Sequence, residues 1–159
     1  MGISISEQKE SNMICGFYGS NRYLSNFYHS PIKYKGIVYQ NSEAAYQAQK
    51  CKNKNDRKLF YNLTGAEAKR IGKTIEMIDA WDKYKTPIMF EIVFQKFLQN
   101  ISLKNRLLKT NNELIVETNY WHDNYWGNCE CEKCKDINGN NMLGCILMDV
   151  RYVLREMNE

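Results

Sequence analysis

Four polar residues near position 45 have the spacing that one face of a helix requires. Glu43, Tyr46, Gln47 and Lys50 stand at i, i+3, i+4 and i+7, so a helix places them on the same side. A carboxylate and an ammonium with an amide between them can form a polar face for acid–base chemistry. The alternative is an amphipathic helix whose Glu/Lys pattern is simply solvated, and periodicity alone favours that alternative.

A second group of reactive and aromatic residues lies in the segment Asp123–Gly127, followed by a Gly- and Asn-rich stretch at 139–144. An acid in a loop beside an aromatic wall suits general acid–base catalysis, because apolar surroundings shift the pKa of a carboxyl group. A turn followed by a helix cap explains the same residues equally well. Trp81, before a helical pattern, is more often a core anchor than a stacking platform for a planar ligand.

Three closely spaced thiols, Cys129, Cys131 and Cys134, are the third candidate, and Cys145 adds a possible fourth. Three or four thiolates can hold tetrahedral zinc, but structural zinc sites usually pair two short Cys-x-x-Cys knuckles, and the second knuckle is missing. The two histidines lie well apart in the sequence, which argues against His-based zinc catalysis. We therefore expect no metal and interpret the segment as a thiol-bearing surface loop.

Composition sets the remaining limits. The chain has 159 residues, of which 43% are hydrophobic and 25% charged, as in an ordinary globular domain with its own core. No apolar run approaches the roughly 18 residues of a membrane span. The net charge of +4 accompanies abundant lysine and asparagine, a bias that AT-rich genomes produce. The densest basic stretch, 50–58, is typical of a solvated helix end, which favours a phosphate-bearing small molecule over a nucleic-acid surface.

Several function classes lack their motifs. We find no Gly-rich P-loop, no G-x-G-x-x-G and no G-x-S-x-G nucleophile elbow, which leaves the nucleotide-binding and hydrolase folds that carry them unsupported. The N-terminus has no secretory signal pattern. We therefore expect a cytoplasmic protein whose cysteines are reduced.

Patterning predicts one α+β domain, mainly helical with a small sheet. Residues 1–12 are expected to be a flexible N-terminus, with the domain at 13–159. Strands are predicted at 13–18 and 114–117, a loop at 19–27 and a hairpin at 32–39. Helices are predicted at 41–51 (capped by Asn41 or Ser42), 56–62, 66–72, 85–99 (with Pro87 in its first turn), after Ser102, and at 141–157.

In their order, these segments resemble the NADAR (YbiA-like) family. The family pattern is met by S-N-F at 25–27, S-E-x-x-x-Q-A-x-K at 42–50, a central Trp81, D-x-x-W-G at 123–127, and G-x-N-x-L-G-x-x-L-M-x-x-R at 139–151. The resemblance spans about residues 14–155, nearly the whole chain. Each motif alone is weak, but five in order at compatible spacing make a strong signal.

The resemblance implies a YbiA-like fold and N-glycosidic bond chemistry without a cofactor. Some members hydrolyse ribosylamino-pyrimidine phosphates of riboflavin synthesis, and others remove ADP-ribose from guanine bases. The expected partners are thus a phosphorylated ribosyl or ADP-ribosyl substrate, or ADP-ribosylated nucleic acid. By analogy, the catalytic positions are Glu43, Asp123 and Lys50, and the substrate-binding positions are Trp81, Trp126, Asn26, Gln47, Arg22 and Gly127. The sequence does not assign acid and base between Glu43 and Asp123.

Two departures from the family pattern keep other functions open. Ala44 stands where members commonly have histidine after the motif glutamate, and a cysteine-bearing insertion at 129–135 replaces a short Gly-rich stretch. The missing imidazole motivates a non-catalytic ADP-ribose or nucleotide-binding module. The thiols motivate a zinc-loop interaction protein.

Overall fold

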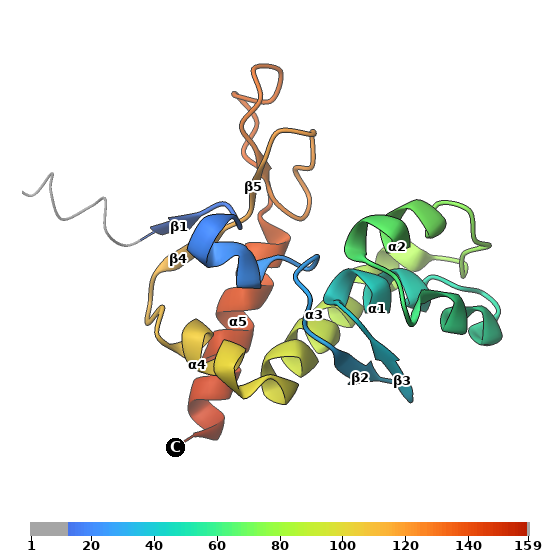
Figure 1. Cartoon of the computed structure of the whole chain (residues 1–159). Helices are drawn as coiled ribbons and strands as arrows, with labels where there is room; N and C mark the ends of the chain where they lie inside the picture. Colours follow the sequence, from blue (N-terminus) through green and yellow to red (C-terminus); the bar gives the residue numbers. More distant parts are fainter. Residues whose placement is uncertain (1–12, 159) are drawn as a thin grey trace, which may run out of the picture.

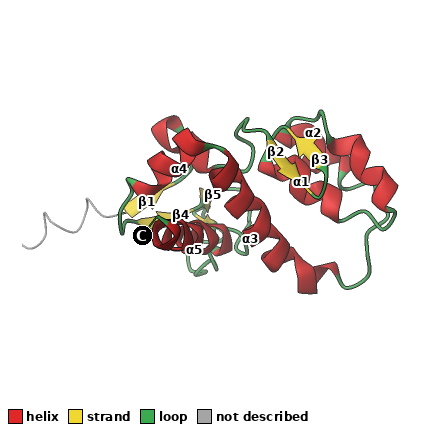
Figure 2. Ribbon diagram, turned by 90° about the horizontal axis from the view of Figure 1, so that it is seen from below, coloured by secondary structure: helices red, strands yellow, loops and turns green. Residues whose placement is uncertain are grey.

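The computed structural model describes residues 13–158. Its long central helix α3 separates two groups of elements (Figures 1 and 2). On one side lie the β2–β3 hairpin, α1 and α2; on the other lie β1, β4, α4 and α5. In chain order the elements are β1 (Met13–Cys15), the 3-10 helix η1 (Gly19–Leu24), β2 (Ile32–Tyr34), β3 (Ile37–Tyr39), α1 (Ser42–Gln49), the 3-10 helix η2 (Lys54–Phe60), α2 (Gly65–Ile71), α3 (Trp81–Gln99), α4 (Ile101–Leu108), β4 (Leu114–Val116), β5 (Thr118–Asn119), β6 (Asn128–Cys129) and α5 (Met142–Met157).

Within residues 13–158, the predicted small sheet consists of three separate two-stranded pairs. β1 pairs in parallel with β4, β2 in antiparallel with β3, and β5 in parallel with β6. The β2–β3 turn is Lys35-Gly36, and both residues have positive φ (48° and 84°), as the tightest hairpin turns require. β5 and β6 were not predicted, because two-residue strands leave no alternating pattern to detect.

The core is formed mainly by α1, α3 and α5. Ala45, Ile92, Phe97, Leu147 and Leu154 have no exposed side-chain surface. α3 packs against both α1 and α5, so it holds the two groups of elements together. Within residues 13–158, no helix has both the length and the apolar character needed to cross a bilayer.

Several predicted boundaries are wrong, for local reasons. α3 begins at Trp81 rather than 85, so Pro87 lies in the second turn and not in the first. α4 begins at Ile101 with Asn100 at its N-cap, so Ser102 does not cap it. The predicted loop at 19–27 contains η1, and the predicted helix at 56–62 is the 3-10 helix η2. The expected flexible N-terminus lies outside the described residues.

α1 starts where the sequence predicted, and its cap explains why. Asn41 Oδ1 accepts a hydrogen bond from the backbone N–H of Ala44 at 2.8 Å, and its Nδ2 donates to the Leu63 carbonyl at 2.9 Å. The first bond satisfies an N–H that has no partner inside the helix, and the second ties the cap to the segment before α2. Asn41 therefore fixes both the start of α1 and its direction.

Candidate active site

Glu43 is the carboxylate that α1 carries into the interior. Its side chain is 8% exposed, its backbone N–H donates to the Asn26 carbonyl at 3.0 Å, and its Oε1 accepts from Gln47 Nε2 at 2.6 Å. Burial raises the pKa of Glu43 above its ordinary value, and the Gln47 hydrogen bond and the charges of Lys69 and Lys50 oppose this. The expectation that this face of α1 is solvated is wrong. A buried carboxyl of perturbed pKa is instead typical of a reaction site.

Two buried amide oxygens next to Glu43 have no hydrogen-bond partner among the described residues. They are Asn26 Oδ1 and Gln47 Oε1; the Asn26 amide nitrogen contacts Met89 Sδ at 3.3 Å. Gly72 makes room for the Gln47 amide, since a Cβ on Gly72 would lie 2.0 Å from Gln47 Oε1. Buried polar atoms are rarely left unpaired, so these two oxygens are unused acceptors beside Glu43.

An aromatic wall stands beside this carboxylate. The Tyr46 ring lies 5.3 Å from Trp81 and 5.7 Å from Trp126, measured between ring centroids. Lys50 Nζ lies 5.2 Å from the Tyr46 centroid and 5.9 Å from the Trp81 centroid. Burial lowers the pKa of Lys50, and the charge of Glu43 opposes that effect. The helix motif, the central tryptophan and the D-x-x-W-G motif thus meet around one tyrosine.

Asp123 organises the loop that carries Trp126. Its Oδ1 accepts hydrogen bonds from the backbone N–H groups of Tyr125 (3.0 Å) and Trp126 (2.9 Å). The fully buried Asn119 side chain bonds both backbone groups of Asp123. Asn119 Oδ1 accepts from the Asp123 N–H at 3.2 Å, and Asn119 Nδ2 donates to the Asp123 carbonyl at 2.7 Å. The geometry therefore gives Asp123 the turn-forming role that the sequence left open beside catalysis.

Glu117, which the sequence did not single out, is a second carboxyl of perturbed pKa. Burial raises the pKa of Glu117 to about 7, and the charge of Asp123 adds to this effect. The hydrogen bond from Asn119 and the charge of Lys69 lower the pKa in part. A Cβ on Gly127 would lie 1.6 Å from Glu117 Oε2, so Gly127 is the residue that leaves space for this carboxylate. The signal in the sequence was a single acid at the end of an apolar strand, and the resemblance had assigned Gly127 to substrate binding rather than to making room for this acid.

These contacts bring all but one of the predicted site residues into one region. Lys69, on α2, links its two sides, because its charge acts on both Glu43 and Glu117. The exception is Arg22, which is exposed on η1; its side chain makes no hydrogen bond or ion pair within residues 13–158. Two open hollows of about 560 and 550 Å³ lie beside β1 and α4 and beside β2 and α3, and no predicted site residue lines either of them.

Comparison with known proteins identifies the family of this chain. The model of the NADAR domain family matches residues 7–155. The chain is a member of the NADAR family. It is 36% identical over 140 residues to an N-glycosidase of Nostoc punctiforme, covering 84% of this chain and 86% of that protein. It is also 32% identical over 134 residues to the N-glycosidase YbiA of Escherichia coli, covering 82% of this chain and 80% of YbiA.

Two further comparisons bear on fold and length. The NMR structure of E. coli YbiA superposes with a TM-score of 0.77 at 27% identity, covering 94% of this chain and 92% of that one. This confirms the predicted α+β, YbiA-like fold. A riboflavin biosynthesis protein of Vibrio vulnificus is 34% identical over 137 residues, covering 84% of this chain but only 36% of that protein. This NADAR domain therefore matches one part of a longer protein there.

Proposed function

We propose that this NADAR domain is an N-glycosidase that hydrolyses the bond between a ribose and a base. The observation that carries the proposal is the pair of carboxyls, Glu43 and Glu117. The pKa values of both are raised, and the charge of Lys69 partly lowers both of them. The names of the curated relatives support the same reaction, since the Nostoc and E. coli proteins are N-glycosidases.

The two carboxyls suit the two halves of the reaction. Breaking the C1′–N bond builds positive, oxocarbenium-like charge on the sugar and negative charge on the departing base. With a pKa of about 7, Glu117 is about half protonated at neutral pH and can donate that proton to the base nitrogen. Glu43, held by Gln47 and near two lysines, serves as the carboxylate that stabilises the sugar cation and takes a proton from the attacking water. The hydroxyl of that water then bonds to C1′.

In this scheme Asp123 is a positioning residue. One of its oxygens is committed to two backbone N–H groups, and its charge contributes to the raised pKa of Glu117. The N–H groups that it binds include that of Trp126, so it also places the aromatic wall. Lys50, whose pKa is lowered by burial, is a candidate phosphate ligand, a partner of the Glu43 carboxylate, or an amine that attacks C1′.

The surroundings favour a planar base and an anionic substrate. Trp81 and Trp126 flank Tyr46, and such rings stack on base or sugar faces. The charges of Lys69 and Lys85 both reach Lys50, so three lysines gather near the wall and can meet phosphate. A ribosylamino-pyrimidine phosphate and ADP-ribose on guanine, free or in a nucleic acid, both fit this description. The riboflavin biosynthesis relative favours the first.

A product assay with both substrates tests the proposal. Cleavage of the pyrimidine substrate yields the free aminopyrimidine and a phosphorylated ribose; cleavage of the guanine adduct yields guanine and ADP-ribose. Glu43→Gln and Glu117→Gln should each abolish most turnover, while Glu156→Gln, an exposed glutamate on α5, should not. No cleavage of either substrate by folded wild-type protein at high concentration refutes the proposal.

A non-catalytic ADP-ribose-binding module is the second candidate, and Ala44 is the observation that favours it. The residue is fully buried beside Glu43 and supplies no polar group where family members commonly have histidine. Calorimetric binding of ADP-ribose by wild-type protein, with no turnover of either substrate, would support this second function. Restoration of turnover by Ala44→His would show that the imidazole is the missing part.

A further inference from the structure

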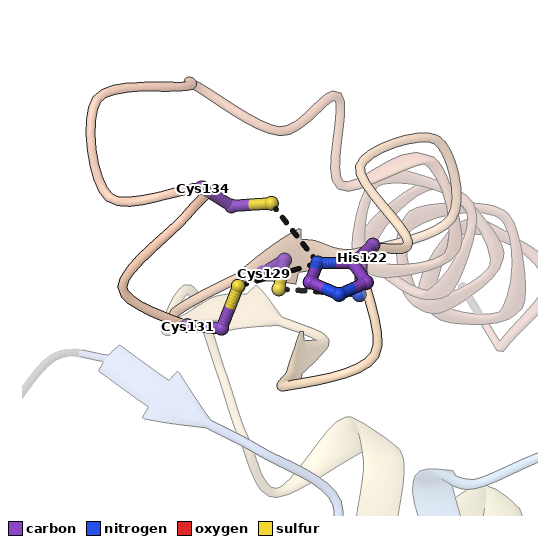
Figure 3. A group of neighbouring side chains, drawn as sticks. All are labelled: His122, Cys129, Cys131 and Cys134. Carbon is purple, nitrogen blue, oxygen red and sulfur yellow. Dashed lines mark hydrogen bonds between the residues drawn. The ribbon is translucent and has the colours of Figure 1, made fainter.

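Four potential metal ligands meet in the loops around β5 and β6. His122, Cys129, Cys131 and Cys134 each offer one ligand atom, and these atoms all lie within 4.8 Å of one another (Figure 3). In Figure 1 this segment projects from the body beyond the start of α5. The interpretation as surface thiols is wrong for Cys129 and Cys134, which are buried.

The two separations from His122 are close to those of a tetrahedral zinc site. Zinc binds thiolate sulfur at about 2.3 Å and imidazole nitrogen at about 2.0–2.1 Å, which places tetrahedral ligand atoms about 3.5–3.8 Å apart. His122 Nδ1 lies 3.3 Å from Cys131 Sγ and 3.5 Å from Cys134 Sγ. Because the ligand atoms lie up to 4.8 Å apart, closing the group around one ion requires side-chain shifts of up to about 1 Å.

Two features of the backbone point to a ligand as well. His122 has a φ of 69°, a left-handed conformation that histidine adopts more readily than most residues and that turns its side chain toward the three thiols. Its backbone N–H donates to Cys129 Sγ at 3.3 Å, and such a bond stabilises a metal-bound thiolate. Both features hold His122 and Cys129 in place beside the other two thiols.

We propose that His122, Cys129, Cys131 and Cys134 bind one zinc ion in a closed structural site. The set offers three thiolates and one imidazole, which is the ligand type of structural zinc, and leaves no open position for a substrate. Our expectation of no metal rested on the missing second cysteine knuckle. The fold supplies the fourth ligand from His122 instead, and Cys145 lies exposed on α5 outside the group.

The ion would fasten the loop that carries the D-x-x-W-G motif. His122 and Cys129 directly flank the segment 123–128, so one metal ties both of its ends together. Asp123, Trp126 and Gly127 lie in that segment. This second step rests on the proposed function only for its catalytic consequence; the metal site itself does not depend on it.

Metal analysis of the whole chain, purified in reducing buffer without chelators or added metal, tests the site. We expect one zinc per chain by mass spectrometry, and thiolate-to-metal charge-transfer absorption after replacement by Co²⁺. Cys134→Ser and His122→Asn should weaken zinc binding by more than the roughly 10- to 100-fold that loss of an outer-shell partner costs. Cys145→Ser is the matched control and should bind zinc like the wild type.

The outcomes separate clearly. Wild-type protein without stoichiometric zinc and without a cobalt–thiolate band would overturn the site, as would iron in its place or a disulfide between two of the three cysteines. The cobalt spectrum of the wild type keeps the test decisive even if a variant fails to fold. Hydrogen exchange then addresses the second step: zinc removal should raise exchange in 119–129 and leave α1 unchanged. Equal exchange in both forms would refute the fastening role.

Discussion

The proton that Glu117 holds at neutral pH leads to the sharpest prediction about this NADAR domain. With a pKa of about 7, the side chain is about half protonated at pH 7 and about 1% protonated at pH 9. If Glu117 protonates the departing base, kcat should fall about 50-fold between these pH values. General acids contribute roughly 100- to 10,000-fold, so Glu117→Gln should lower kcat by about that factor and remove the alkaline limb of the profile.

The same substitution should have the opposite effect on stability. The pKa of Glu117 is about 7 in the folded protein, against an ordinary value of 4.5, so the folded state holds this proton more tightly than the unfolded chain does. The resulting stability is full below pH 4.5 and is lost as the pH rises through 7. The shift corresponds to about 3 kcal/mol, reduced to about 1–2 kcal/mol by solvent screening of this partly exposed side chain.

Glu117→Gln should therefore raise the free energy of unfolding by about 1–2 kcal/mol at pH 8, relative to any change that it causes at pH 4. Urea denaturation at the two pH values measures this, and kcat is measured on the same samples. Glu156→Gln serves as the control for charge alone. An alkaline limb that persists in Glu117→Gln would refute the acid assignment. Loss of activity together with loss of stability at pH 8 would show that Glu117 is a packing residue.

Three further predictions follow from single contacts. Gly127→Ala should abolish most activity and destabilise the fold, because its Cβ would lie 1.6 Å from Glu117 Oε2. Gly19→Ala is the control: its φ is +58° but no atom lies within 4 Å of the added Cβ, so it should cost only about 1–2 kcal/mol in thermal denaturation. Burial lowers the pKa of Lys96 to about 7, so the unfolded chain holds this proton more tightly than the folded protein does. The free energy of unfolding should therefore rise from pH 7 to pH 9, and Lys96→Met should flatten that rise in urea titrations. Asn41→Ala should cost about 1–3 kcal/mol in the same assay, because it removes a helix cap and leaves a carbonyl unpaired.

Local patterns predicted the elements whose signals lie within a few residues. The cap residue before α1, the Lys35-Gly36 turn and the apolar spacing of α5 each act over one or two turns of chain, and the corresponding elements start within a residue or two of their predicted positions. The start of α3 was missed because Ala80 adopts a left-handed conformation (φ 57°), which ends the preceding turn and lets the helix begin at Trp81. An alanine at position 80 does not predict a left-handed conformation, so nothing in the sequence indicated this helix start.

The burial of the α1 face could not be read from its own sequence. An isolated helix with Glu43 and Lys50 on one side predicts a solvated face, since charged side chains are almost never fully buried unless paired. In the structure η2, α2 and α3 all pack against α1, and Gly72 of the α2 end makes room for Gln47. Those contacts come from other elements of the chain, so periodicity offered Glu43 as a candidate, and only the family resemblance favoured a reaction site over a solvated face.

The asparagine content, which the sequence alone attributes to genome composition, has a specific structural use in this domain. Asn119, Asn124, Asn128 and Asn141 each accept a hydrogen bond from a backbone N–H through the side-chain oxygen, and these bonds bind Asp123, Cys129, Gly139 and Glu117. A two-residue parallel pair such as β5–β6 has too few ladder bonds to hold the chain between its strands. The asparagine amides take over that task by bonding backbone groups that a longer sheet would pair. The segment from Glu117 to Cys134 therefore owes its shape to side chains rather than to regular structure, which is why periodicity could not predict where its carboxyls and thiols lie.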